Sequence, residues 1–331
     1  MSAGVPNPPH VPALCDQLIA RLSPVTGKWV DCTAGAGGYT LALLDAGAEQ
    51  VWALDCDPEA CKLVAERVSH LKKRVTVVNA WFAELDQVLG PAEAGQVAGV
   101  VFDLGVSSMQ LDVPGRGFSF MRDGPLDMRM NCKGRTAADI VNNEPEATLA
   151  DILFHFGEEP AARRIARAIV NSRRSAPIST TLQLANLVGS CLPRARSRSA
   201  RHPATRSFQA LRIAVNGELE QLSEGLLAAE RVLQPGGKLA VVSFHSLEDR
   251  IVKRFLHGDA GASNRHLPPR AGIQRGFVPL TIRPLTPDGR ELEVNRRARS
   301  AKLRIGIRTD SPPGQPRRNA PGAVRPAGGR G

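Results

Sequence analysis

The fold is decided by the stretch Val100-Val101-Phe102-Asp103-Leu104-Gly105-Val106-Ser107-Ser108-Met109-Gln110. Its apolar, β-branched opening predicts a short buried strand, and the glycine and serines mark where that strand ends. In an open α/β sheet, ligands bind at the carboxyl ends of the strands, so the aspartate at the end of this strand indicates a ligand-binding or catalytic site. The chain then leaves on a long excursion, and helix and strand alternate again only near Phe208. We therefore expect cofactor and substrate to meet at Asp103.

Three earlier stretches have the same strand character, at 28–33, 51–55 and 75–78, and each leads into a helical pattern. A further helical pattern precedes them at 10–22. Strand alternating with helix predicts a parallel sheet with right-handed crossovers, which is an α/β fold.

After the excursion, leucines recur at helical spacing over 219–233, and a fifth strand is expected at 238–244. A helix is expected to begin at Ser246 with a capping-box pattern. Pro287-Asp288-Gly289 predicts a turn between two extended segments. Residues 303–308 alternate between aliphatic residues and Arg or Gly, which predicts a last strand with one wet face.

Gly35-Ala36-Gly37-Gly38 joins the first strand to its helix, and three glycines in four residues let a ligand approach the backbone closely. Nicotinamide, flavin and S-adenosylmethionine enzymes share such turns, but this spacing is not Gly-x-Gly-x-x-Gly, which disfavours a pyrophosphate site. Asp55 ends the second strand, where a carboxylate can accept hydrogen bonds from ribose hydroxyls, and Asp57 is the competing candidate. Phe82, just past the third strand, either packs against an adenine ring or fills the core.

The chain has 331 residues and a net charge of +11, and its 42% apolar content supports a full core. Positive charge is concentrated, because residues 161–212 include eleven arginines and no Asp, Glu or Lys. This bias predicts a polyanionic partner, with a merely soluble basic face as the alternative.

The six cysteines form no Cys-x-x-Cys pair and lack the histidine spacing of a zinc site, so we expect reduced thiols and no metal. The N-terminus lacks a secretory pattern, and no apolar run is long enough for a membrane span. These features predict a cytoplasmic protein without a membrane segment.

Five sequence blocks together carry a resemblance that covers about residues 10–308. They are Asp103-Leu104-Gly105-Val106-Ser107-Ser108, Arg116-Gly117-Phe118-Ser119-Phe120-Met121-Arg122-Asp123-Gly124-Pro125-Leu126-Asp127-Met128-Arg129-Met130, His202-Pro203-Ala204-Thr205-Arg206, Ser243-Phe244-His245-Ser246-Leu247-Glu248-Asp249-Arg250 and Arg297-Ala298-Arg299-Ser300. In these blocks and in their order the chain resembles the 16S rRNA (cytosine-N4)-methyltransferase H family, also called MraW.

The resemblance implies a class I S-adenosylmethionine-dependent methyltransferase fold, a Rossmann-like doubly wound sheet with an inserted helical domain. We expect the methyltransferase domain over 1–108 and 208–310, the RNA-recognition insertion over 109–207 and a disordered basic tail over 311–331. The implied reaction is methylation of the exocyclic N4 of a cytidine in the decoding region of 16S rRNA. The implied partner is that rRNA, in the small ribosomal subunit or an assembly intermediate. The oligomeric state stays open, a homodimer included.

The family's cofactor contacts, carried over position by position, fall on one set of residues. They are Gly37, Gly38, Tyr39, Asp55, Phe82, Asp103 and Gln110. The family usually has histidine where this chain has Tyr39. A backbone contact at that position survives the change, whereas a contact through an imidazole does not.

Methyl transfer is an in-line displacement, so most of its rate comes from alignment of donor and acceptor. Oxygen atoms aimed at the hydrogens of the cytosine amine favour its pyramidal transition state. Asp103 is our candidate catalytic residue, together with the carbonyls of Leu104 and Gly105. A capping role for Asp103 is the structural alternative. His245 is expected to line the site or hydrogen-bond there rather than act as a base.

Glu248 and Asp249 are interpreted as helix-start acids. Methylation at cytosine C5 is disfavoured, since that route needs a thiolate near the fourth strand and no Pro-Cys dipeptide occurs. Two alternatives to the implied function stay open: a methyltransferase with another cytosine target, and a non-catalytic RNA-binding factor that keeps the pocket as scaffold. A nicotinamide dehydrogenase is disfavoured by the glycine spacing and leaves the arginines unexplained.

Overall fold

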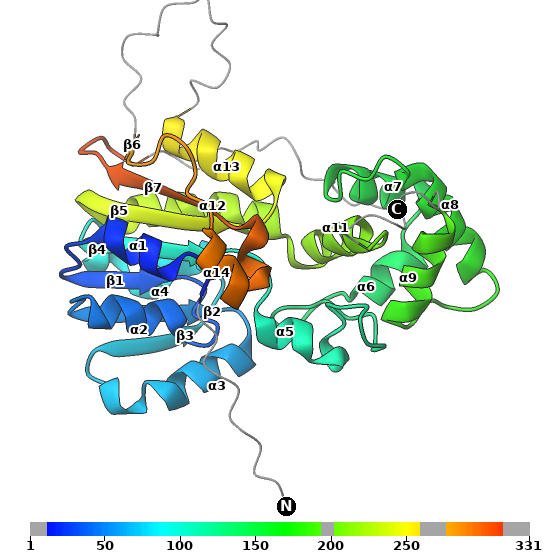
Figure 1. The fold of residues 1–331 in the computed structure, drawn as a ribbon, viewed down its shortest axis with the longest axis horizontal. Coiled ribbons are helices and arrows are strands. Elements are labelled where there is room, and N and C mark those ends of the chain that lie inside the picture. The colour runs from blue at the N-terminus through cyan, green and yellow to red at the C-terminus, as the bar shows by residue number, and fades with distance from the viewer. Residues whose placement is uncertain (1–11, 193–201, 259–275, 314–331) are drawn as a thin grey trace, which may run out of the picture.

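The computed structural model describes residues 12–192, 202–258 and 276–313. A twisted sheet with helices on both faces forms one body, and a bundle of helices forms a second body beside it (Figure 1). Helix α11 (Thr205–Asn216) lies between the two bodies. No helix in the described ranges has both the length and the apolar character needed to cross a bilayer.

The sheet has seven strands in the order β3-β2-β1-β4-β5-β7-β6. The first five pair in parallel, and β7 pairs antiparallel with both β5 and β6. The order of the strands reverses between β1 and β4, and the carboxyl end of such a switch point is where open sheets bind ligands. The predicted class I methyltransferase sheet is confirmed. The strands are β1 Lys28–Asp31, β2 Gln50–Asp55, β3 Val75–Asn79, β4 Val97–Asp103, β5 Leu233–Ser243, β6 Phe277–Pro279 and β7 Lys302–Arg308.

Alternation along the strands divides the core into two layers. Val101 of β4 packs with α1, α2 and α3, whereas Val100 and Phe102 pack with α4, α12 and α13 on the other face. Both faces are buried, which is why β4 is an almost continuous apolar run. These helices are α1 Cys15–Leu22, α2 Gly38–Asp45, α3 Pro58–Arg67, α4 Leu85–Leu89, α12 Glu218–Val232 and α13 Ser246–His257.

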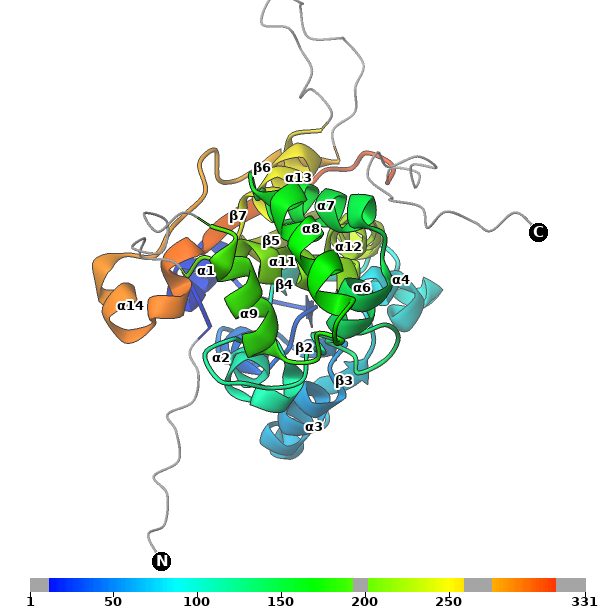
Figure 2. The same ribbon diagram turned by 90° about the vertical axis from the view of Figure 1, so that its right-hand side faces the viewer.

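The insertion has a hydrophobic cluster of its own, and Figure 2 shows its helices in front of the sheet. Phe208 and Leu211 of α11 belong to this cluster, so the helix runs through the predicted boundary at 207 and keeps its apolar face on the insertion. The domain boundaries stay predictions. The other helices of this part are α5 Ser108–Asp112, α6 Ala137–Asn143, α7 Glu146–His155, α8 Ala162–Arg173 and α9 Thr181–Ser190.

Two sequence expectations differ in detail from the structure. Strand β5 begins at Leu233, five residues before the predicted start, because Leu233 pairs with Val97 ahead of a register shift. The stretch Pro287-Asp288-Gly289 is not a turn between extended segments but the start of α14 (Gly289–Val294). The Asp288 carboxylate accepts a hydrogen bond from the N–H of Glu291 at 2.9 Å, so the aspartate caps a helix.

The prediction of a wet face on the last strand is wrong. Arg304 and Arg308 of β7 are 6% and 5% exposed, because α13 covers this side of the strand. The guanidinium of Arg304 donates to Asp249 at 2.7 Å, and Arg308 donates to the carbonyl of Glu230 at 3.1 Å. A Cβ on Gly306 would lie 2.6 Å from the Leu256 side chain of α13, so the strand and the helix pack closely there.

Most of the predicted tail, 314–331, lies outside the described residues. So does the start of the first predicted helix, and the described helix α1 begins at Cys15.

The buried Arg304–Asp249 pair gives a stability prediction. Asp249→Ala leaves the guanidinium buried without its carboxylate and should lower the free energy of unfolding by about 3 kcal/mol. Asp249→Ala/Arg304→Met removes both charges and should recover most of that loss. Urea unfolding measures both, with Asp310→Ala at an exposed position as control. A single variant as stable as the parent protein would contradict the assignment.

Candidate active site

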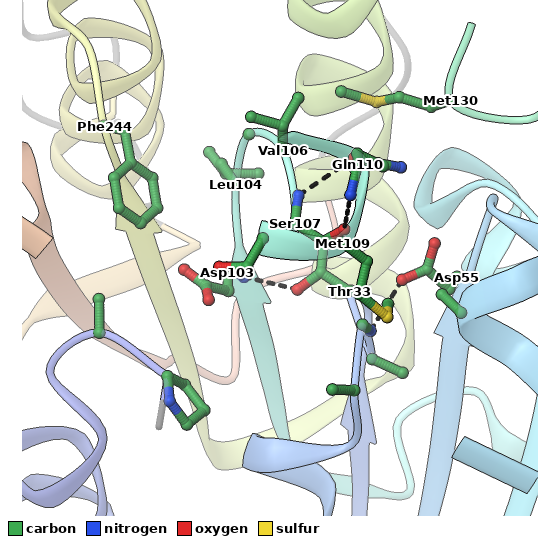
Figure 3. A pocket seen from close by; sticks show the side chains of 18 of the residues that line it. Thr33, Asp55, Asp103, Leu104, Val106, Ser107, Met109, Gln110, Met130 and Phe244 are labelled. Carbon is green, nitrogen blue, oxygen red and sulfur yellow. Dashed lines mark hydrogen bonds between the residues drawn. The ribbon is translucent and has the colours of Figure 1, made fainter. Parts of the chain in front are cut away.

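A pocket opens at the carboxyl ends of β1, β2, β4 and β5, where the predicted site residues converge (Figure 3). The Asp55 and Asp103 side chains come from neighbouring parts of the sheet, and the start of the insertion lies between them in this view. Six of the seven predicted cofactor residues line the pocket, and Gly37 does not. The six are Gly38, Tyr39, Asp55, Phe82, Asp103 and Gln110.

The glycine turn shapes the pocket through backbone conformation. Gly35 and Gly37 have φ angles of +51° and +80°, which disfavour residues with a side chain. Gly37 is the residue before α2, and its N–H donates to the carbonyl of Ala34 at 2.6 Å. Its contribution is therefore the turn itself, which brings Gly35 and Gly38 to the pocket wall.

The structure separates the two carboxylates that compete for the cofactor. Asp57 is 2% exposed and fully engaged: it caps α3 through Glu59 N–H and accepts from Gln110 Nε2 at 2.9 Å and Arg116 Nη1 at 2.6 Å. Asp55 lines the pocket and also accepts the N–H of Gly35 at 2.8 Å. Burial raises the pKa of Asp55 to about 6, and the backbone N–H groups it accepts limit the rise. Of the two, only Asp55 lines the pocket.

Asp103 ends β4 with a carboxylate in the pocket. Its Oδ1 is buried without a hydrogen-bond partner among the described residues, and its N–H donates to Thr33 Oγ1 at 2.7 Å. Burial, and then the charges of Asp31 and Glu248, raise the pKa of Asp103 well above its ordinary value. The capping alternative is not supported, because Ser107 caps α5 by accepting the N–H of Gln110 at 3.2 Å.

Gln110 and Phe82 line the pocket and also have structural partners. The Gln110 side chain accepts the N–H of Ser107 at 3.1 Å while it donates to Asp57, so its amide is held in one orientation. Phe82 packs edge-on against Phe102 with ring centroids 5.5 Å apart. The two roles proposed for Phe82 are therefore compatible, since one ring serves both core and pocket.

Tyr39 holds the N-terminal segment in place. Its hydroxyl donates to the carbonyl of Ala13, and its side chain is buried. Ala13 itself lines the pocket, and the N–H of Leu14 donates to Glu291 of α14 at 2.5 Å. Residue 39 thus shapes the pocket wall through Ala13.

Polar residues that the sequence did not predict line another part of the pocket wall. Arg212 of α11 donates from Nε and Nη2 to both oxygens of Glu218 at 2.7 and 2.8 Å, and both residues line the pocket. Glu248 lines it too, at the start of α13. The arginine block in the sequence indicated only a basic surface. Glu218 could have been predicted from its position, because it is the first residue of a helix at the ligand-binding edge of the sheet.

His245 lies behind this wall rather than in it. Its ring accepts the N–H of Glu248 at 3.4 Å as the cap of α13, one residue before the predicted start of the cap. Asp249 pairs with Arg304 and does not line the pocket. Glu248 is a helix-start acid, as expected, but it also faces the pocket.

Glu218, His245 and Glu248 bring one ligand atom each to within 4.8 Å of one another, which the sequence did not predict. Such a group can hold a cation in principle. Here Glu218 binds the Arg212 guanidinium, and Glu248 accepts the N–H groups of Phe244 and His245. We therefore interpret the group as an ionic network around Arg212.

The pocket suits S-adenosylmethionine on grounds of charge and shape. That cofactor has two cationic groups, and the buried Asp103 oxygen without a partner supplies an uncompensated acceptor for one of them. The glycine turn leaves room at the backbone, Asp55 faces the pocket at the ribose position of the fold, and Phe82 offers an apolar surface. These residues fit the cofactor as a set.

A family model described as the MraW methylase family matches residues 7–309 of the chain. The chain belongs to the MraW methylase family. A Cereibacter sphaeroides protein is 55% identical over 311 residues, which cover 93% of this chain and 92% of the relative. A Jannaschia protein is 50% identical over 315 residues, 94% of this chain and 95% of the relative. Both relatives are named "Ribosomal RNA small subunit methyltransferase H". This MraW family member is a methyltransferase, and its methyl donor is S-adenosylmethionine.

The buried acids predict how cofactor binding depends on pH. A cationic ligand favours the ionised form of Asp103, whose pKa is raised in the free protein, so binding should release a proton. Affinity for S-adenosylmethionine should therefore rise with pH above the range in which an ordinary aspartate titrates, by at most about tenfold per unit for one proton. Calorimetry over this range tests it. Asp103→Asn should bind more weakly and with a flatter profile, and an equal slope in that variant would exclude Asp103 as the group responsible.

Proposed function

We propose that this protein transfers a methyl group from S-adenosylmethionine to the exocyclic N4 of a cytidine in the decoding region of 16S rRNA, within the small ribosomal subunit or its assembly intermediate. The relatives named above support an rRNA substrate. One observation carries the reaction type: the Asp103 oxygen without a partner among the described residues lies in a pocket that both the glycine turn and the insertion-side residues line.

The cytosine amine is a poor nucleophile because its lone pair is delocalised into the ring. The cofactor, when bound, supplies an electrophilic methyl group. The protein's task is to hold the amine in line and to favour a pyramidal nitrogen. Asp103 and the carbonyls of Leu104 and Gly105 are the acceptors at the strand end, and all three residues line the pocket. Their hydrogen bonds to the amine would be strongest in the transition state, which is where they increase the rate.

The methylated amine is cationic and loses a proton. Asp103 is suited to accept it, since burial and neighbouring negative charges raise its affinity for protons. We assign no base role to His245, because its ring caps α13 and does not line the pocket.

The insertion supplies a basic surface for RNA. Arg163, Arg164 and Arg167 are exposed on α8, while Ile165 and Ile169 of the same helix are buried. Contacts from such arginines to phosphates give affinity with steep salt dependence and little base choice. Arg194, Arg196, Arg198 and Arg201, which belong to the same predicted surface, lie outside the described residues. A target inside folded rRNA must also be unstacked to reach the strand ends.

The proposed reaction is tested with labelled S-adenosylmethionine and small subunits that lack the modification. The protein should label 16S rRNA, and mass spectrometry of the nucleosides should find N4-methylated cytidine. Asp103→Ala should reduce turnover by at least about a thousandfold, because the acceptor for the amine is lost. Asp151→Ala, at an exposed position on α7, should retain it. Wild-type kcat in Asp103→Ala would remove this residue from the mechanism.

The RNA surface is tested by a triple variant, Arg163→Ala/Arg164→Ala/Arg167→Ala. Binding to small subunits should weaken, and the slope of log K against log salt should become shallower by about 0.7 to 0.9 for each phosphate that is no longer neutralised. Cofactor affinity should not change. Lys72→Ala/Lys73→Ala is the control. These exposed lysines precede the amino end of β3, whereas the pocket lies at the carboxyl ends of the strands. Unchanged subunit binding in the triple variant would refute this surface.

A further inference from the structure

We propose that Arg212 and Glu218 form the subsite that reads the base edge of the target cytosine, an inference that rests on the proposed function. The two residues come from consecutive helices, α11 and α12, joined by Gly217 with a φ of +59°. Their side chains are 16% and 9% exposed, and both line the pocket that contains Asp103. The pair is therefore largely buried in the protein yet faces the cavity where the reaction is placed.

The pair presents a donor beside an acceptor. Two N–H groups of Arg212 bind the Glu218 carboxylate, which fixes the guanidinium plane. Glu248 adds another carboxylate, with an oxygen within 4.8 Å of a Glu218 oxygen. Glu248 and Asp103 both line this pocket, so further carboxylate acceptors accompany the pair in the cavity where we place the amine.

Cytosine has the complementary edge. Its N4 amine donates and its N3 accepts, so a carboxylate can accept from N4 while a guanidinium donates to N3. Uracil reverses both groups, with an acceptor at O4 and a donor at N3. The carboxylate would then face an acceptor and the guanidinium would face a donor, so neither could form its hydrogen bond. Such a mismatch in a site built for hydrogen bonding is a strong basis for rejection.

The pocket also offers apolar surface for the faces of a base. Phe244 lines it at the end of β5, and its ring lies 3.7 Å from the position of a Cβ on Gly105. Figure 3 shows this ring on the side of the pocket where Asp103 lies. Leu222, one turn after Glu218 on α12, lines the pocket as well. Flipped bases are held by this combination of apolar faces and a hydrogen-bonding edge.

The competing explanation is that the pair only ties α11 to α12. Single and double variants separate the two explanations. Glu218→Gln or Arg212→Met leaves one charge buried without its partner, which harms either role. Arg212→Met/Glu218→Gln removes both charges. If the pair only joins the two helices, stability and methylation rate should both recover in this variant. If the pair reads the base, stability should recover but the methylation rate should stay low.

The experiment is single-turnover methylation of small subunits lacking the modification, with cofactor affinity measured by calorimetry. We expect the double variant to lose at least about a hundredfold in rate, as when a buried hydrogen-bonding partner of a reacting group is removed. Its cofactor affinity and thermal midpoint should match the wild type. Glu224→Gln, exposed on the same helix α12, should behave as wild type.

A double variant with more than about a third of the wild-type rate would overturn the inference, and so would a tenfold loss of cofactor affinity. These outcomes differ from failure of the proposed function, in which the wild-type protein itself forms no N4-methylated cytidine on the small subunit.

Discussion

The structure depends on the convergence of three acidic strand ends at the switch point of the sheet. Asp31, Asp55 and Asp103 end β1, β2 and β4, and the charge of Asp31 raises the pKa of both other residues. Asp31 itself is fully buried, and burial raises its pKa to about 6 even though Thr40 donates to it at 2.7 Å. Keeping that one group ionised at neutral pH costs the folded state about 3 kcal/mol. Ionised carboxylates are therefore unfavourable at this edge in the free protein, and a cationic ligand that binds there offsets part of that cost.

The position of the insertion follows from the same edge. Its first helix, α5, starts a few residues after Asp103, and Asp57 binds both Gln110 and Arg116 of the entering chain. The chain returns through α11, whose Arg212 faces the pocket. Both ends of the excursion are thus tied to the residues around the cofactor site. Because both connections of the insertion lie beside the strand ends, an RNA nucleotide bound to the insertion can be held close to the cofactor site.

Local signals were sufficient for much of the fold and part of the site. The strand-end acids and the glycine turn follow from short patterns in which the residue and its role lie close together in sequence. The errors arose where distant segments decide the environment. Arg304 looked solvent-exposed because its partner Asp249 lies 55 residues away and α13 covers the strand only in the folded chain. The choice between Asp55 and Asp57 depended on Arg116, 59 residues beyond Asp57. Periodicity records which residues share a face but not what packs on it.

The arginine block shows how burial divides one residue type between two tasks. Arg163, Arg164 and Arg167 keep their charges in solvent, where they can meet phosphates at a distance and are screened by salt. Arg212, in the same block of sequence, is paired with Glu218 inside the pocket, where its geometry is fixed and solvent screening is weak. Mobile surface charges can bind the sugar–phosphate backbone of RNA, which is the same at every nucleotide. A pair with fixed geometry can instead recognise the edge of a single base. Affinity for RNA and choice of base are therefore expected to reside in different arginines, one group on the outer surface of the insertion and one residue where the insertion meets the sheet.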